Sequence, residues 1–510
     1  MNLSDLFAAG AARAPEKAAL RCDGGEGAGG ARETSFAALH AAAGRLAAGF
    51  AARGLRRGDR IALLMGNRPE WAVAHLAALR LGAVTVPLNL AYRRREIAHV
   101  LSDAEPRLLV TEASERERLE ELAPAERASV EEVLLAEDLE RWMGEPGGAA
   151  AQEPPRVDGD DLALLLYTSG TTGRSKGAML SHNNLLATVC GLLAAWGWRA
   201  DDRLLLALPL FHTHGLVVGL HCALAAGATV LLRRRFTAAA VVADLLGGEP
   251  SLFFGVPTMY VRLVEALGGE ADVRGRLGGM RLFCSGSAPL AAETFAAFEA
   301  LTGHAILERY GMTETGMNLS NPLAGPRRPG TVGTPLPGVS MRIVDREGAA
   351  APAGGEGELL VRGGNVFAGY WRDPEKTAAS FRADGEGRRW FATGDLARRD
   401  PESGYVTLLG RRQELILCGG YNVYPREVEE VLLGCPGVRE AAVVGRPDPE
   451  WGEVPVAYVV ADGPLDEPAV LAHCKRELAG FKVPRAFRPV EALPRNPLGK
   501  VLKHLLDGES

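Results

Sequence analysis

The sequence predicts an α/β protein with a large N-terminal layered domain and a small C-terminal α+β domain. Helical and strand patterns alternate through most of the chain, which favours layered sheets with helices on their faces. The 510 residues are too many for one ordinary core, so two or more domains are expected. Beyond residue 409 the pattern becomes shorter and self-contained. We therefore predict domains at 1–409 and 410–510.

The N-terminal elements follow one another in regular order. An Ala-rich stretch predicts a helix at 36–53, followed by a strand at 60–65, a helix at 70–81 and a strand at 82–87. The polar residues 144–160 are rich in Gly and Pro and predict an exposed loop. This alternation is typical of a layered sheet with helical crossovers.

Later segments continue the same alternation. The apolar run 162–167 predicts a buried strand, and Ser181 predicts the N-cap of a helix that begins near residue 183. Further buried strands are predicted at 204–211, 228–232, 252–256 and 282–284. The C-terminal domain is predicted to contain helices at 426–433 and 469–478 and strands at 440–444 and 454–460.

Composition narrows the class of protein. The formal net charge of -6 and a pI near 6.0 do not favour binding to nucleic acid or to an anionic membrane. The seven cysteines are scattered and form no CxxC pair, which indicates free thiols in a reducing compartment. The first residues show no basic start with an apolar run, and no apolar stretch is long enough to span a bilayer. We expect a cytoplasmic protein.

Residues 167–177, YTSGTTGRSKG, form the strongest local motif. Glycines let backbone N–H groups approach an anion closely, while hydroxyls and Lys176 add donors and positive charge. A flexible linker is the alternative, but linkers are not flanked by an apolar strand and a capped helix. Gly177 stands where a Walker A loop has Ser or Thr, so this is a different triphosphate loop. Its candidate phosphate-binding residues are Thr168, Ser169, Gly170, Thr171, Thr172, Gly173 and Lys176.

This string resembles the signature loop of the acyl-adenylate-forming (AMP-dependent synthetase/ligase) superfamily, which includes acyl-CoA synthetases, luciferases and adenylation domains. The other motifs of that superfamily follow in order along almost the whole chain, at 285–289, 308–314, 393–395, 410–411 and 494–500. Any one of these residues could be a turn, a helix-start charge or a solvated tail residue. Because all of these motifs occur in the order of the superfamily, a purely structural explanation of each one is untenable.

The resemblance implies a role for each nucleotide-binding residue. Ser287, Ala288 and Pro289 match the adenine-binding turn, and Tyr310 with Gly311 matches the position that packs on adenine. Thr313 would contact the α-phosphate, and Glu314 would help to hold Mg²⁺. Asp395 and Arg411 would bind the ribose. ATP, Mg²⁺ and coenzyme A are the implied cofactors, and Lys176, Thr313, Glu314 and Lys500 the implied catalytic residues.

The implied reaction has two steps. A carboxylate attacks the α-phosphorus of ATP and pyrophosphate leaves, with Lys500 bridging the two anions. The thiol of CoA then attacks the mixed anhydride and releases AMP. In this family the C-terminal domain rotates between the steps, and its face carrying Gly419 and Gly420 would serve CoA. Gln413 stands at the hinge, where the family usually carries Lys or Asp, so the energetics of rotation are expected to differ.

Arg309 is the residue that indicates which acid is the substrate. Many fatty-acyl and aryl ligases have Gly before the motif Tyr, and a guanidinium at that place needs an anionic partner. A short dicarboxylate supplies one, whereas a fatty acid does not. LERYGMTET and residues 208–215, LPLFHTHG, resemble the malonyl-CoA synthetase branch. In that branch His212, Thr213 and Met317 would line the acyl pocket.

Several alternatives stay open at this point. His212 and His214 could each be satisfied core histidines, and Arg235, a second cationic candidate, is more readily a solvated strand end. Ser285 is a further substrate candidate. The enzyme could be a short-chain, medium-chain or aryl acid–CoA ligase, or could load a carrier protein. A non-catalytic nucleotide-binding protein is disfavoured by the complete motif set. Malonate and methylmalonate differ by one methyl group, which a pocket separates by only about 1–3 kcal/mol.

Overall fold

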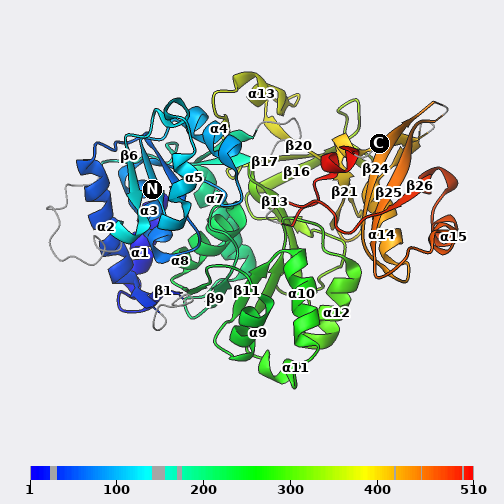
Figure 1. Ribbon diagram of the computed structural model, residues 1–510, viewed down its shortest axis with the longest axis horizontal. Helices are drawn as coiled ribbons and strands as arrows, with labels where there is room; N and C mark the ends of the chain where they lie inside the picture. The colour runs from blue at the N-terminus through cyan, green and yellow to red at the C-terminus, as the bar shows by residue number, and fades with distance from the viewer. Residues whose placement is uncertain are drawn as a thin grey trace.

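The computed structural model describes residues 2–22, 32–139, 155–168, 175–418, 421–449, 451–496 and 499–508 (Figure 1). The predicted loop at 144–160 is therefore described only from residue 155. Within the described chain no helix is both long and apolar enough to cross a membrane. The longer helices are α1 (Leu3–Arg13), α2 (Phe36–Ala52), α3 (Pro69–Leu81), α4 (Arg94–Ala104), α7 (His182–Trp196), α9 (Ala238–Leu246), α10 (Pro257–Leu267), α12 (Ala292–Thr302), α14 (Pro425–Leu433) and α15 (Glu467–Glu477). The shorter ones are α5 (Arg116–Glu120), α8 (Cys222–Ala226), α11 (Val273–Arg276) and α13 (Pro374–Ala379).

A seven-stranded sheet forms the first layer. Its order is β18 (Gly369–Tyr370), β8 (Lys176–Ser181), β7 (Leu162–Thr168), β4 (Val84–Pro87), β3 (Arg60–Leu64), β5 (Leu108–Thr111) and β6 (Glu132–Leu135). Alternate side chains of β3 enter two cores: Leu63 packs with α2 and α3, and Leu64 packs with α4. Both faces are buried, as expected for a largely parallel sheet.

A nine-stranded sheet forms the second layer. Its order is β15 (Thr334–Pro335), β14 (Gly316–Ser320), β13 (Leu307–Met312), β12 (Leu282–Ser285), β11 (Leu252–Gly255), β9 (Arg203–Leu206), β10 (Thr229–Leu232), β1 (Ala18–Cys22) and β2 (Arg32–Ser35). Phe254 of β11 joins the large core between the two sheets, and Phe253 joins the core formed with α9, α10 and α12. The two layers therefore share one central core.

Two smaller sheets complete the molecule. One contains β16 (Val339–Val344), β17 (Glu356–Gly363), β20 (Arg389–Arg399) and β19 (Phe381–Ala383), with β21 (Val406–Arg411) paired to β20. The other contains β23 (Tyr421–Val423), β22 (Ile416–Cys418), β25 (Gly452–Ala461) and β24 (Val438–Asp448), with β26 (Ala486–Pro489) paired to β25. This last sheet and α14 and α15 enclose their own core at one end of the molecule (Figure 1).

The layered N-terminal region and smaller C-terminal region confirm the predicted fold class. The predicted boundary after residue 409 falls inside β21, and the next strand, β22, already belongs to the C-terminal sheet. A short helical turn, η4 (Arg412–Glu414), connects the two strands. The exact division into domains remains a prediction, and we propose that it follows β21.

Most predicted elements lie within two residues of their observed ends, with two exceptions. The strand predicted at 440–444 is too short, because β24 continues to Asp448, and the strand predicted at 204–211 is too long. Ser181 caps α7, where its hydroxyl accepts a hydrogen bond from Asn184 N. The strand predicted at 204–211 is wrong beyond Leu206, where β9 ends. Pro209 has no N–H for a strand ladder, and the Asn67 side chain instead binds Leu208 O and Leu210 N, each at 2.9 Å.

Candidate active site

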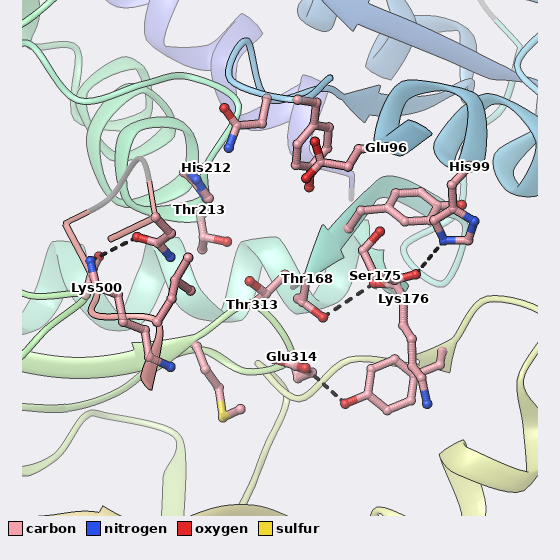
Figure 2. A pocket seen from close by; sticks show the side chains of 18 of the residues that line it. Glu96, His99, Thr168, Ser175, Lys176, His212, Thr213, Thr313, Glu314 and Lys500 are labelled. Atoms are coloured by element: carbon pink, nitrogen blue, oxygen red, sulfur yellow. Dashed lines mark hydrogen bonds between the residues drawn. The ribbon is translucent and has the colours of Figure 1, made fainter. Parts of the chain in front are cut away.

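A cavity of about 1840 Å³ opens between the N-terminal layers and the C-terminal region. Figure 2 shows Lys500 on one side of it, Lys176 on the other, and Thr313 and Glu314 between them. Segments from both regions therefore meet at one place. Among the predicted site residues, the cavity is lined by Thr168, Lys176, His212, Thr213, Ser287, Arg309, Gly311, Thr313, Glu314, Met317, Arg411 and Lys500.

Arg411 lines one end of the cavity, which we call the nucleotide end, and it forms one hydrogen-bonded group with Asp395 and Tyr310, which do not line the cavity themselves. Asp395 on β20 lies opposite Arg411 on β21, and Arg411 Nε binds Asp395 Oδ1 at 2.8 Å. The Tyr310 hydroxyl donates to Asp395 Oδ2. Burial raises the pKa of Asp395, and the positive charge of Arg411 opposes that rise. The predicted ribose and adenine residues are thus brought together.

The phosphate-facing groups are Lys176 and Glu314. Lys176 begins β8 at the end of the predicted phosphate loop, and its Nζ lies 3.4 Å from Asp373 Oδ2. Glu314 lies in the turn after β13 and accepts a hydrogen bond of 2.9 Å from the Tyr370 hydroxyl. Burial raises the pKa of Glu314, whereas the hydrogen bond from Tyr370 lowers it. Neither Tyr370 nor Asp373 was predicted as a site residue.

In the sequence, neither Tyr370 nor Asp373 stands in a pattern that indicates a binding site. Asp373 precedes Pro374 and its side chain caps α13, accepting from Lys376 N at 2.9 Å. Tyr370 is one of nine tyrosines, and its partner Glu314 is 56 positions away. Only the folded chain shows that Tyr370 touches Glu314, predicted to hold Mg²⁺, and that Asp373 touches Lys176, predicted to bind phosphate.

Lys500 reaches the cavity on a tight turn of the C-terminal region. The Asn496 side chain accepts from Lys500 N at 2.9 Å, and Gly499 adopts a positive φ of 79°. Lys500 is exposed to the cavity, yet protein atoms around the ammonium remove part of its water. This desolvation and the nearby Arg411 hold the pKa of Lys500 below its ordinary value. Gln413 of η4 also lines the cavity.

The other end of the cavity, which we call the acyl end, consists of His212, Thr213, His214 and Arg309. His214 begins a π-helical segment, η3 (His214–His221), and Arg309 lies on β13. All four residues line the cavity. Their buried atoms without a hydrogen-bond partner are His212 Nε2, Thr213 Oγ1, His214 Nε2, Arg309 Nε and Arg309 Nη2. Such atoms are costly unless a ligand binds them.

Among these groups, the guanidinium of Arg309 is the most costly to bury without a partner, because it carries a charge. Only 3% of the residue is exposed, and burial lowers its pKa, an effect that Cys284 and Tyr260 oppose only in part. A Cβ atom at Gly286 would lie 2.4 Å from Arg309 Cζ, so glycine leaves the space that the guanidinium occupies. A buried arginine without a carboxylate partner is a strong site for an anion.

The histidines at the acyl end are neutral. Burial lowers the pKa of His212 to about 4. Burial, with repulsion from Arg309, also lowers the pKa of His214, whose Nδ1 lies 3.3 Å from Ser287 Oγ. Neutral imidazoles can donate or accept beside a bound anion without adding further charge.

Some predicted residues lie elsewhere. Ser285 is fully buried in β12 and does not line the cavity, and neither do Ala288 and Pro289 in the turn that follows. Arg235 is exposed beyond β10 and is also absent from the cavity lining. The structure thus gives no support to substrate contact by Arg235. The remaining predictions, Ser169, Gly170, Thr171, Thr172, Gly173, Gly419 and Gly420, fall outside the described residues.

Comparison with known proteins agrees with this geometry. The AMP-binding enzyme family matches residues 7–371, and the AMP-binding enzyme C-terminal domain matches residues 427–500. The sulfoacetate–CoA ligase of Cupriavidus necator is 38% identical over 98% of this chain and 96% of its own length. The mitochondrial malonate–CoA ligase ACSF3 of Bos taurus is 37% identical over 88% of this chain and 80% of its own.

A solved structure extends the likeness to three dimensions. The crystal structure of ATP-bound MatB from Rhodopseudomonas palustris matches with a TM-score of 0.90 and 43% identity, over 99% of this chain and 98% of that one. The family match covers well over half of the residues, and the two relatives named as CoA ligases are matched over 96% and 80% of their own length. The chain therefore belongs to the AMP-binding enzyme family and is an AMP-forming acyl-CoA synthetase that works through an acyl-adenylate.

Proposed function

We propose that this synthetase activates a short acid carrying a second anionic group, and that malonate or methylmalonate is its substrate. The single observation that carries the proposal is Arg309, a buried guanidinium at the acyl end with two nitrogen atoms unpaired. A distal carboxylate would accept from both atoms in the bidentate geometry that arginine favours. A monocarboxylic acid would leave them unpaired at a cost of about 1–3 kcal/mol or more.

The relatives support the same class of acid. One is named for malonate and another for sulfoacetate, and both acids carry a terminal anion one carbon away from the carboxylate that is activated. Sulfoacetate is therefore the second candidate. Its sulfonate offers three acceptor oxygens, for which Arg309, His212 and Thr213 have unpaired atoms.

The residues present fit ATP bound with Mg²⁺. Glu314 offers a single buried carboxylate, and the described residues contain no group of three or more His, Cys, Asp or Glu able to hold a metal. Such a site suits Mg²⁺, which usually takes one or two protein carboxylates and completes its shell with water and substrate phosphates. When bound, Mg²⁺ would neutralise negative charge on the phosphates.

Each protein group then has a definable task in the first step. The acid oxygen attacks the α-phosphorus, and the bond to the bridging oxygen of pyrophosphate breaks. Lys500 places a positive charge where the two anions approach, Thr313 donates to the α-phosphate, and Lys176 holds the departing phosphates. Asp395 and Arg411 fix the ribose. Preorganised donors of this kind need no rearrangement when charge develops.

The second step requires a different use of the same domain. The CoA sulfur attacks the acyl carbon, and the oxygen that links it to AMP leaves. Because Lys500 lines the cavity that the thiol must also enter, we propose that the C-terminal domain turns about η4 near Gln413. The turn would expose the C-terminal face that carries Gly419 and Gly420.

The proposal is tested by AMP and pyrophosphate release with a panel of acids. We would compare malonate, methylmalonate, sulfoacetate, acetate, butyrate, octanoate and benzoate for the wild type and for Arg309→Gly. Malonate or methylmalonate should be preferred, and Arg309→Gly should lower malonate kcat/KM by about 100-fold, the loss of a charge-assisted bidentate contact. Arg235→Gly, an exposed arginine outside the cavity, is the matched control.

The outcomes separate the candidates. Turnover with sulfoacetate alone would keep the anion site and replace the carboxylate by a sulfonate. Turnover only with uncharged acids, or an unchanged malonate kcat/KM in Arg309→Gly, would contradict the proposal. Release of AMP only with a carrier protein as acceptor would instead favour the carrier-loading alternative.

A further inference from the structure

Tyr370 lies between the two groups that face the phosphates. Its hydroxyl donates to Glu314 Oε1 at 2.9 Å, and its ring lies 5.9 Å from Lys176 Nζ. The residue is only 9% exposed, although it lines the cavity. A dashed line at Glu314 in Figure 2 marks this hydrogen bond. Tyr370 thus contacts the side chains of both Glu314 and Lys176.

The backbone around Tyr370 is fixed on both sides. Tyr370 pairs with Ala178 of β8, and Trp371 N donates to Gly177 O at 2.7 Å. Tyr370 N in turn donates to Thr377 Oγ1 at 2.8 Å. The segment that carries the phenol is therefore tied to the same strand that begins with Lys176.

The next turn adds a second constraint. Arg372 has a positive φ of 54°, which a residue with a side chain adopts at a cost and only where its surroundings hold it. Its guanidinium binds both oxygens of Glu105 at the end of α4, at 3.0 and 2.5 Å. The Trp371 indole donates to Asp103 O of α4 at 3.0 Å. Tyr370 is thus presented by a rigid support rather than by a free loop.

The hydrogen bond has a consequence for the carboxylate that accepts it. Because Oε1 of Glu314 is engaged by the phenol, rotation of the carboxylate is restricted and Oε2 is the oxygen left for a cation. A ligand oxygen that is held in advance binds a metal more tightly than one that must be ordered on binding. The aromatic face also offers Lys176 a weak cation–π contact that keeps its ammonium near the same place.

We propose that Tyr370 is a positioning residue for the adenylation step, which orients Glu314 for the metal–ATP complex through its hydroxyl and supports Lys176 through its ring. The proposal rests on the roles assigned above to Glu314 and Lys176. It predicts that the two parts of the side chain have separable effects. The hydroxyl governs the metal-dependent part of ATP binding, and the ring governs a smaller part that needs no metal.

Two variants separate those parts. Tyr370→Phe removes the hydroxyl and keeps the ring, whereas Tyr370→Leu removes both. Tyr405→Phe is the matched control, since its hydroxyl binds Pro326 O at 2.6 Å at an exposed position outside the cavity. Equilibrium binding of ATP, with and without Mg²⁺, would be measured by calorimetry, and Mn²⁺ binding to the enzyme–ATP complex by electron paramagnetic resonance.

Tyr370→Phe should weaken Mn²⁺ binding in the ATP complex by about tenfold, the usual effect of losing a group that orients a metal ligand. Its affinity for ATP without metal should match the wild type. Tyr370→Leu should show the same metal defect and a further loss of about two- to threefold in metal-free ATP affinity. Thioester formation from supplied acyl-adenylate and CoA should remain at the wild-type rate in Tyr370→Phe.

Other outcomes would overturn the proposal. Wild-type metal binding in Tyr370→Phe would remove the orienting role, and equal losses in adenylation and thioester formation would show a purely structural one. Glu314→Gln, measured in parallel, separates this inference from the function on which it rests. If Glu314→Gln leaves metal binding unchanged, the role given to Glu314 fails. If Glu314→Gln weakens it and Tyr370→Phe does not, only the role of Tyr370 fails.

Discussion

The two ends of the cavity differ in how far their polar atoms are satisfied. At the nucleotide end, both oxygens of the Asp395 carboxylate have partners, from Tyr310 and Arg411. At the acyl end, Nε and Nη2 of Arg309 and Nε2 of His212 and of His214 have none within the described chain. The part of the site that serves a reactant common to all members is therefore preorganised, whereas the part that selects the acid is completed by the acid itself.

Lys500 lines the same cavity as both ends. Its removal should have the largest effect on the rate of adenylation. Lys500→Ala should lower the rate of pyrophosphate release by about 10²–10³-fold, as expected when a preorganised charge is removed from a transition state. Thioester formation from supplied acyl-adenylate should stay near the wild-type rate, because the proposed second step does not use this lysine. Rapid-quench measurement of each half-reaction checks the expectation.

The matched control is Lys475→Ala, an exposed lysine of α15 in the same C-terminal region. It should change neither half-reaction. A loss of both half-reactions in Lys500→Ala would contradict the division of labour and indicate that Lys500 supports the whole region rather than the first step.

Glu308 is a buried residue near the site whose side chain has an unpaired oxygen atom but no access to a ligand. It precedes Arg309 on β13 but does not line the cavity, and its Oε2 has no hydrogen-bond partner. Burial raises the pKa of Glu308 to about 7, although Arg426 and the hydrogen bond from Leu290 N act in the opposite direction. Protonation, and not a ligand, can therefore relieve this group.

The raised pKa makes stability depend on pH in a defined direction. Between the ordinary pKa of 4.5 and about 7, folded Glu308 keeps its proton while the unfolded chain has released it. The free energy of unfolding should therefore fall as pH rises through this window, by on the order of 3 kcal/mol for this group. Urea unfolding at pH 5 and pH 8 should show a smaller fall in Glu308→Gln. An identical fall in both proteins would refute the assignment.

The nucleotide end could be predicted from sequence more fully than its supports. Tyr310, Asp395, Arg411 and Lys500 stand in short motifs, because the chemistry of ATP restricts the residue types at those positions. The Ala-rich helix α2 was predicted to within one residue at each end. Periodicity and motifs describe neighbours along the chain, so they carry little information on contacts formed only by folding.

The features that sequence reasoning missed depend on contacts between distant parts of the chain or on position in the fold. The contact of Tyr370 with Glu314 joins segments 56 residues apart, and no local pattern marks it. The end of β9 depends on the side chain of Asn67, which lies 141 residues before Leu208. Arg235 was weighed as a cationic candidate because charge alone was visible, whereas its position outside the cavity was not.

The smallest expected effect tests the comparison of the two ends directly, through stability without any nucleotide or acid. Arg309→Met removes an uncompensated buried charge and keeps an apolar chain, so the free energy of unfolding should rise by about 1–2 kcal/mol. Tyr310→Phe leaves Asp395 Oδ2 without its donor, so the same quantity should fall by about 1–2 kcal/mol. Thermal unfolding would show opposite shifts in Tm.

Malonate should raise the Tm of the wild type and of Tyr310→Phe but not that of Arg309→Met, because only the last lacks the anion site. A lower Tm in Arg309→Met would mean that the guanidinium is satisfied by the protein, and the acyl end would then be as preorganised as the nucleotide end.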